Sequence, residues 1–214
     1  LYMPFLGIAL QEHFKAQPIA GTQLTAMAQY ILLFFLYGQA GIYYSKMDIS
    51  RRLDISLMNV SRGVQELEEL DLVTTKKKGR SSMVVANYDR KNLYEHAKPY
   101  LRNPVQKCIY AKKQQWLLDL PTAGSEALYT LKETTDRVTH PVRAIEKKVY
   151  LEHAEEIESI DPAWDTHTDY VELEVWRYDP DRFSQESIVD SLSLALSLKG
   201  EQDEAMKLNI NKLL

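Results

Sequence analysis

Side chains suited to contact with nucleic acid gather between positions 45 and 80 of the 214-residue chain. The amides of Asn59 and Gln65 can form paired hydrogen bonds with adenine, and the Arg62 guanidinium can form them with guanine. The Ser61 hydroxyl can bind a phosphate or a base edge. The segment therefore predicts contact with the major groove of double-stranded DNA, with base edges bound by Arg62, Asn59 and Gln65 and the backbone by Ser61.

Apolar residues of the same segment predict a helix with one buried face. Val60, Val64 and Leu67 recur at spacings of four and three, which is the period of an amphipathic helix. A helix over residues 57–70 turns the remaining positions outward. These outward residues, all predicted to contact DNA, are Met58, Asn59, Ser61, Arg62 and Gln65.

A shorter helix precedes this one across a tight turn. Ser45 is placed to cap a helix over residues 46–53, and Ser56 is placed to cap the helix that follows. Asp54 and Ile55 stand between the two. The sequence thus predicts a helix-turn-helix, and we count both capping serines among its DNA-contacting residues.

Four cations occupy the turn that follows, between strands expected at residues 72–77 and 82–87. They are Lys76, Lys77, Lys78 and Arg80. Gly79 supplies the backbone freedom that a hairpin turn needs. Because clustered cations bind phosphates, we expect this hairpin to contact the DNA backbone.

The segments 45–53 and 60–70, followed by Leu72-Val73, resemble the core pattern of MarR-type winged helix-turn-helix transcriptional regulators. The resemblance covers approximately residues 24–86. It implies that residues 57–70 are the recognition helix, that residues 76–80 are the wing, and that the protein binds DNA as a homodimer. Two features depart from the pattern: Leu57-Met58 are apolar, and Asp71 stands where glycine usually ends the helix, although aspartate can adopt the left-handed conformation.

The rest of the chain predicts an α+β protein of two domains. Residues 1–102 form the winged helix domain, with a first helix marked by Leu6, Leu10 and Phe14 and a buried helix over residues 24–36. Residues 103–120 are expected to form a connector helix, with Cys108 buried in it. Residues 121–214 form a small α+β domain with a helix at 125–134, extended chain at 142–150, a strand at 170–178, and closing helices at 188–198 and 205–214.

Charge separates the two halves of the chain. Residues 1–113 hold 16 Lys and Arg against 9 Asp and Glu, a net charge of +7, whereas residues 114–214 hold 10 against 21, a net charge of −11. Because phosphate binding depends on local cations, we expect only the front half to meet DNA. The acidic half is left for dimerisation, a small-molecule effector or a protein partner.

Other chemistry finds weak support. Asp165, His167 and Asp169 alternate, but tetrahedral metal sites usually draw ligands from separate segments. Gly124-Ser125 could open a nucleotidyltransferase site, yet Asp136 stands alone at suitable range. Aromatic residues at 164, 170, 176 and 178 fit a small core better than an effector pocket. We therefore predict no enzyme, no cofactor and no metal.

The remaining expectations concern location and role. The single cysteine excludes an internal disulfide framework, and no segment is predicted to span or target a membrane, so we expect the protein in the cytoplasm. Its expected role is that of a repressor. The alternative is an antitoxin or adaptor whose acidic domain binds a partner protein and which binds DNA for autoregulation, because residues 120–128 faintly resemble abortive-infection-type antitoxins.

Overall fold

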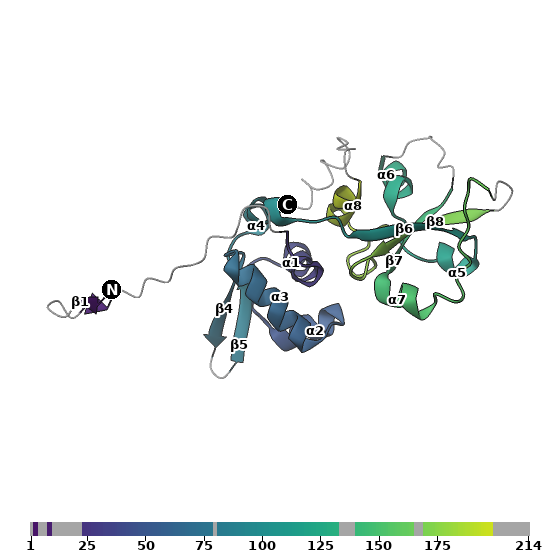
Figure 1. Cartoon of the computed structure of the whole chain (residues 1–214). Helices are drawn as coiled ribbons and strands as arrows, with labels where there is room; N and C mark the ends of the chain where they lie inside the picture. The colour runs from purple at the N-terminus through teal and green to yellow at the C-terminus, as the bar shows by residue number, and fades with distance from the viewer. Residues whose placement is uncertain are drawn as a thin grey trace.

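The computed structural model describes residues 2–3, 8–9, 23–78, 81–132, 140–164 and 169–198. Within these ranges the chain is α+β, as predicted, and has two parts that lie side by side (Figure 1). The winged helix part runs from residue 23 to residue 101. The second part runs from residue 105 to residue 198.

Three helices and a small sheet make up the winged helix. Its elements are α1 (Ala26–Tyr37), β3 (Tyr44–Ser45), α2 (Lys46–Leu53), α3 (Leu57–Glu69), β4 (Val73–Lys78) and β5 (Ser81–Ala86). The strands are antiparallel in the order β3-β5-β4, and β4 and β5 pair from Val73 opposite Ala86 to Lys78 opposite Ser81. A short helix α4 (Arg90–Ala97) and a 3₁₀ turn η1 (Lys98–Tyr100) follow.

Helix α1 is the centre of the core. Every residue from Ala28 to Leu36 is buried, as its nearly continuous apolar sequence predicted. Helix α3 packs closely on it at Gly63, where an added Cβ would lie 2.6 Å from Ile31 Cδ1 and 3.3 Å from the Ala28 backbone. A side chain at this position would therefore force the two helices apart.

The second part is a mixed sheet with helices on both faces. Its elements are β6 (Val105–Lys112), α5 (Gln115–Leu118), α6 (Gly124–Lys132), β7 (Val142–Glu146), α7 (Lys147–Glu152), β8 (Tyr170–Trp176) and α8 (Ser191–Ser197). The strand order is β6-β8-β7, with β6 antiparallel and β7 parallel to β8. A small apolar cluster, which includes Leu117, Ile145 and Leu173, fills the face toward α5.

The two parts share one core. A single cluster of buried apolar side chains runs from α1, α2 and α3 into the second part, where it includes Trp176, Tyr178 and Leu192. The rings of Tyr30 and Tyr178 stack with centroids 5.2 Å apart. The Gln29 side chain amide also donates to the Tyr178 hydroxyl at 3.1 Å.

The predicted connector helix is wrong, because its residues form strand β6 and the short helix α5. The apolar residues after Pro104 fit a helical period, but Ile109 and Ala111 also fit the alternation of a strand. Pairing with β8 decides the outcome, since Cys108 lies opposite Glu174. Cys108 is accordingly exposed on a strand and not buried in a helix.

Two further predictions at the ends of elements need correction. The expected first helix is replaced at its start by the paired strands β1 (Tyr2–Met3) and β2 (Ile8–Ala9), while Leu6, Leu10 and Phe14 lie outside the described residues. The extended chain expected over residues 142–150 ends at Glu146, where α7 begins. The closing helix expected at 205–214 also lies outside the described residues.

Candidate nucleic-acid interface

Two serines cap the helices of the helix-turn-helix, as predicted. The Ser45 hydroxyl accepts from the Asp48 backbone at 3.0 Å, and the Asp48 carboxylate accepts from the Ser45 backbone at 3.2 Å. The Ser45 hydroxyl also donates to the Asp48 carboxylate at 2.6 Å, and this bond, followed by the one from the Ser45 backbone, lowers the pKa of Asp48. The Ser56 hydroxyl accepts from the Asn59 backbone at 3.2 Å, which fixes the start of α3.

Contacts within the turn between the two helices fix its shape. Asp54 adopts a left-handed conformation with φ of 52°, which ends α2 sharply. The Ser50 hydroxyl then donates to the Ile55 carbonyl at 2.6 Å. The angle between α2 and α3 therefore depends on contacts that are complete before any DNA is bound.

Helix α3 divides into a buried and an outward face. Val60, Gly63, Val64 and Leu67 are buried. Of the outward residues, Met58, Arg62 and Gln65 are exposed, and Asn59 and Ser61 are half-buried. The structure thus brings the five predicted contact residues of α3 to one accessible surface.

Three acids, Glu66, Glu68 and Glu69, lie near the end of α3. The Glu66 carboxylate accepts from the Thr25 backbone and hydroxyl at 2.7 and 2.6 Å, and the Glu68 carboxylate accepts from the Thr75 backbone at 2.7 Å. Two of the three acids therefore hold α3 against α1 and β4.

The hairpin of β4 and β5 carries cations away from the core. Lys76 and Lys77 are exposed, and the Lys76 ammonium lies 6.0 Å from the centre of the Tyr43 ring. Lys78 ends β4, whereas Gly79 and Arg80 lie outside the described residues. At the base of the hairpin Asp71 has φ of 59°, the left-handed conformation predicted for it.

Two exposed cations of α2 were missing from the predicted set. Arg51 and Arg52 occupy the last turn of α2, and the Arg52 guanidinium lies 5.4 Å from the centre of the Tyr44 ring. In the sequence, the signal that could have identified them is a pair of adjacent arginines just before the turn of the helix-turn-helix. They add positive charge to the same domain as α3 and the hairpin.

Comparison with known proteins agrees with this geometry. Residues 22–81 match the model of the MarR family. This stretch forms a MarR-type winged helix. No curated protein and no solved structure matches the chain. The MarR-type domain marks the protein as a transcriptional regulator, and the elements it contains, α1 to the start of β5, are those that position the predicted contact residues.

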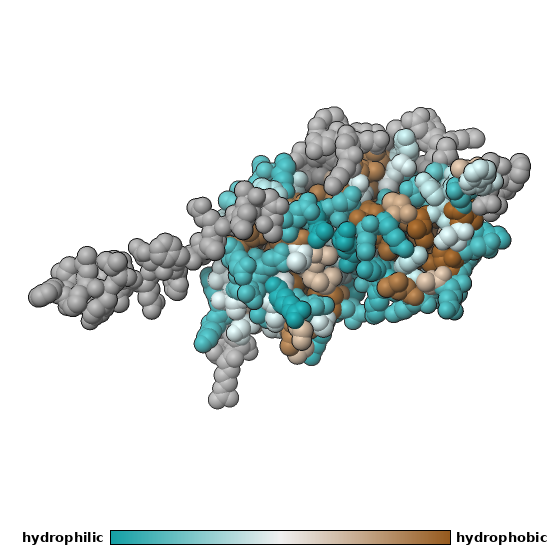
Figure 2. All heavy atoms as spheres, in the orientation of Figure 1, coloured by the Kyte–Doolittle hydropathy of each residue, from teal (hydrophilic) through white to brown (hydrophobic). Residues whose placement is uncertain are grey.

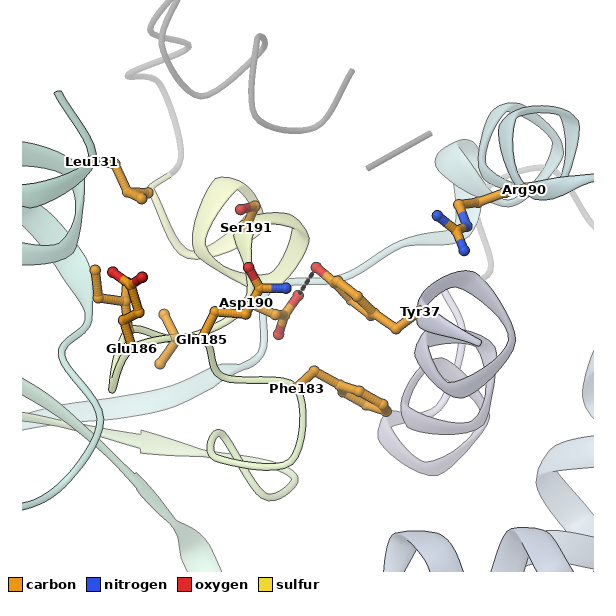
Figure 3. Close-up of a pocket in the computed structure, with 10 residues that line it drawn as sticks. Tyr37, Arg90, Leu131, Phe183, Gln185, Glu186, Asp190 and Ser191 are labelled. Carbon is orange, nitrogen blue, oxygen red and sulfur yellow. Dashed lines mark hydrogen bonds between the residues drawn. The ribbon is translucent and has the colours of Figure 1, made fainter. Parts of the chain in front are cut away.

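A cavity of about 410 Å³ lies where the MarR-type domain meets the second part (Figure 3). Tyr37 of α1 and Phe183 of the second part stack on one side with ring centroids 5.2 Å apart. The Tyr37 hydroxyl donates to Asp190 at 2.8 Å. Burial raises the pKa of Asp190, whose carboxylate also caps α8 by accepting from the Ser193 backbone at 2.9 Å.

The second part contains the other groups that the sequence singled out. Trp176 and Tyr178 are buried in the core, as expected, whereas Trp164 is 85% exposed. Glu174 and Glu172 line a hollow with Gly124 and Ser125, and Asp136 lies outside the described residues. Burial raises the pKa of Glu174 to about 7, and its carboxylate accepts from the Trp176 indole at 2.8 Å.

The described ranges contain neither a cluster of metal-binding side chains nor a membrane-spanning helix. Among those residues no group of three or more His, Cys, Asp and Glu side chains is arranged to hold a metal ion. The helices described are too short or too polar to cross a membrane. Although Cys108 is exposed, partial desolvation of its thiol, followed by the negative charges of Glu174 and Glu172, raises its pKa to about 11, so the thiol stays protonated at neutral pH.

Proposed function

We propose that the protein is a sequence-specific DNA-binding repressor that acts as a cytoplasmic homodimer. One observation carries the proposal: the outward face of α3 presents Asn59, Arg62 and Gln65 beside a hairpin that carries exposed lysines. In this arrangement α3 enters the major groove and the hairpin holds the phosphates of the flanking backbone. Two copies place two recognition helices about one helical turn apart on a palindromic site.

Local charge supports contact through this surface. The front half of the chain carries +7 although the whole chain carries −4. Of the three acids near the end of α3, Glu66 and Glu68 are engaged with Thr25 and Thr75 of the same domain, and Glu69 accepts a hydrogen bond from the Gln65 amide. Helix α3 therefore approaches DNA by its first turns, where the exposed residues are polar, cationic or apolar but not acidic.

Binding to a duplex from the gene's own upstream region tests the proposal. The full chain is titrated against that duplex and against random DNA of equal length at two salt concentrations. We expect tighter binding to the upstream duplex and a steep loss of affinity with salt, with a slope of about 0.9 per phosphate contact. Equal, weak binding to both duplexes would count against the proposal, and sedimentation of the complex tests the dimer.

A second candidate is an antitoxin or adaptor in which residues 114–214 bind a partner protein. The net charge of −11 on this half favours a basic partner. Co-purification of one basic protein at equal stoichiometry supports this role, whereas a homodimer that represses without a partner opposes it.

The cavity at the junction favours a ligand-gated form of the first proposal. It is lined by Tyr37 and Arg90 of the winged helix part and by Phe183 and Gln185 of the second part, so a small molecule bound there would contact both. A ligand changes DNA affinity only if it binds the DNA-bound and free conformations differently. Two results together would support this form. A small molecule relieves repression by the wild type, and the same molecule does not relieve repression by Ser191→Trp, in which the indole fills the cavity.

A further inference from the structure

Two apolar side chains interrupt the polar outer surface of α3. Met58 is 62% exposed and Leu57 is 44% exposed, and both belong to the first turn of the helix. Neither contributes to the buried face, which begins at Val60. Within the part of the chain that the structure describes, both side chains are therefore accessible to a bound molecule.

Met58 lies on the line of α3 that points directly away from the core. It is four residues before Arg62 and seven before Gln65, so the three side chains follow one another along the same outward stripe. Glu69 continues that stripe, and its carboxylate accepts from the Gln65 amide at 3.1 Å. Because Glu69 would repel phosphates, the stripe can approach DNA only by its Met58 end.

The exposed cations of the same domain favour DNA as the molecule that covers Met58. Arg62 is exposed one turn away, and the domain adds the exposed Lys76 and Lys77 of the hairpin. An apolar partner surface would have to desolvate these cations, whereas a DNA groove supplies phosphates for them.

The major groove displays one apolar group, the C5 methyl of thymine. We propose that Met58, with Leu57 beside it, recognises a thymine methyl in the operator, next to the base bound by Arg62. This inference rests on the proposed DNA-binding function and names one of the bases that α3 recognises. The unbranched methionine side chain suits the contact because it adapts its shape to a methyl group on a base edge.

Replacement of thymine by deoxyuridine tests the contact, because it removes the methyl and keeps the base pair. A binding site is first selected from random duplexes with the full chain, and each thymine in it is then replaced in turn. We expect one or two replacements to weaken binding by the wild type about fourfold, the value of one buried methyl group. Met58→Ala should bind the thymine duplex about as weakly as the wild type binds its uracil form.

Leu151→Ala is the matched control. Leu151 is 60% exposed on α7 in the second part, so the substitution removes a similar apolar surface from an element other than α3. This variant should keep the full sensitivity to deoxyuridine. A thermal melt of each variant checks that the exposed substitutions leave the fold intact.

Each remaining outcome overturns part of the proposal. Selective binding with no sensitivity to any deoxyuridine would remove the thymine contact while leaving DNA recognition in place. Sensitivity that persists in Met58→Ala would assign the methyl to another residue. If affinity changes only when a cytosine of the same site is methylated, the recognised base would be 5-methylcytosine and not thymine. Failure to select any site would overturn the proposed function itself.

Discussion

The winged helix and the second part bury different kinds of side chain. Among the described residues, the buried interior of the winged helix is apolar except for Gln29, which faces the junction. The second part buries Glu174, Asp190 and Ser193. One part keeps its charges at the surface, where Figure 2 shows hydrophilic residues over much of the visible face, and the other keeps two carboxyl groups inside.

This difference separates two sources of stability. The winged helix depends on the fit of apolar surfaces, because its described Asp, Glu, Lys and Arg side chains remain in contact with solvent. The second part depends on hydrogen bonds that satisfy buried carboxyl groups, so its stability responds to pH. The following predictions test that contrast, from the largest expected effect to the smallest.

Gly63→Val tests the fit between α1 and α3. The new side chain would meet Ile31 and the Ala28 backbone, so we expect the free energy of unfolding to fall by about 3 kcal/mol, measured by urea denaturation. Gln65→Val introduces the same residue on the outward face of α3 and should change stability by about 0.5 kcal/mol or less. Equal losses in both variants would contradict the packing explanation, because valine has a higher helix propensity than glycine and a lower one than glutamine.

Glu174→Gln tests the buried carboxyl group. The pKa of Glu174 is raised from 4.5 to about 7, so the folded state binds more protons than the unfolded state, and wild-type stability should fall as pH rises between these values. The amide carbonyl can still accept from Trp176. Above pH 7 the variant should therefore be more stable than the wild type by about 3 kcal/mol, and below pH 4.5 the two should match.

Glu155→Gln is the control for this effect, because Glu155 is exposed in the second part. Its denaturation curves should follow those of the wild type at each pH. A stability difference for Glu174→Gln that is the same at pH 4 and pH 8 would contradict the buried-charge explanation.

Arg62→Ala and Lys77→Ala sharpen the contrast at the surface, where neither should alter stability. We expect Arg62→Ala to weaken binding to the selected site by about 1.5 kcal/mol, roughly tenfold, and to relax sequence preference. Lys77→Ala should weaken binding to all duplexes alike and reduce the salt slope by about 0.9. Equal losses on selected and random DNA for both variants would contradict this division.

Tyr37→Phe tests the junction, where the two kinds of interior meet. It removes the hydroxyl that donates to Asp190, and we expect a loss of about 1 kcal/mol in the free energy of unfolding. A double-mutant cycle with Asp190→Asn isolates the contribution of the pair. Additive losses in the cycle would mean that the two side chains do not stabilise each other.

Local signals predicted the winged helix well. Ser45, Ser56 and Asp71 act within a few residues of their partners, so their types and positions were sufficient to place the ends of α2 and α3. The family match over residues 22–81 agrees with that prediction. The α+β class followed from the same alternation of elements.

Long-range pairing explains what the sequence did not reveal. Strand β6 is a strand because it pairs with β8, more than sixty residues later in the chain, as Cys108 and Glu174 show. The Glu66 contact with Thr25 spans 41 residues, and no local pattern marks a glutamate as an acceptor for a distant backbone. The contacts of the candidate interface with DNA stay predictions, since they depend on a partner molecule.

Helix α1 joins the winged helix to the second part. Its residues pack on α3 at Gly63 and, through Tyr30 and Tyr37, on the second part. Excision of residues 104–198 would leave those aromatic rings facing water, so we expect the winged helix to be less stable when it is separated from the second part. Because the two described parts share one apolar cluster, we expect them to unfold together in a single cooperative transition.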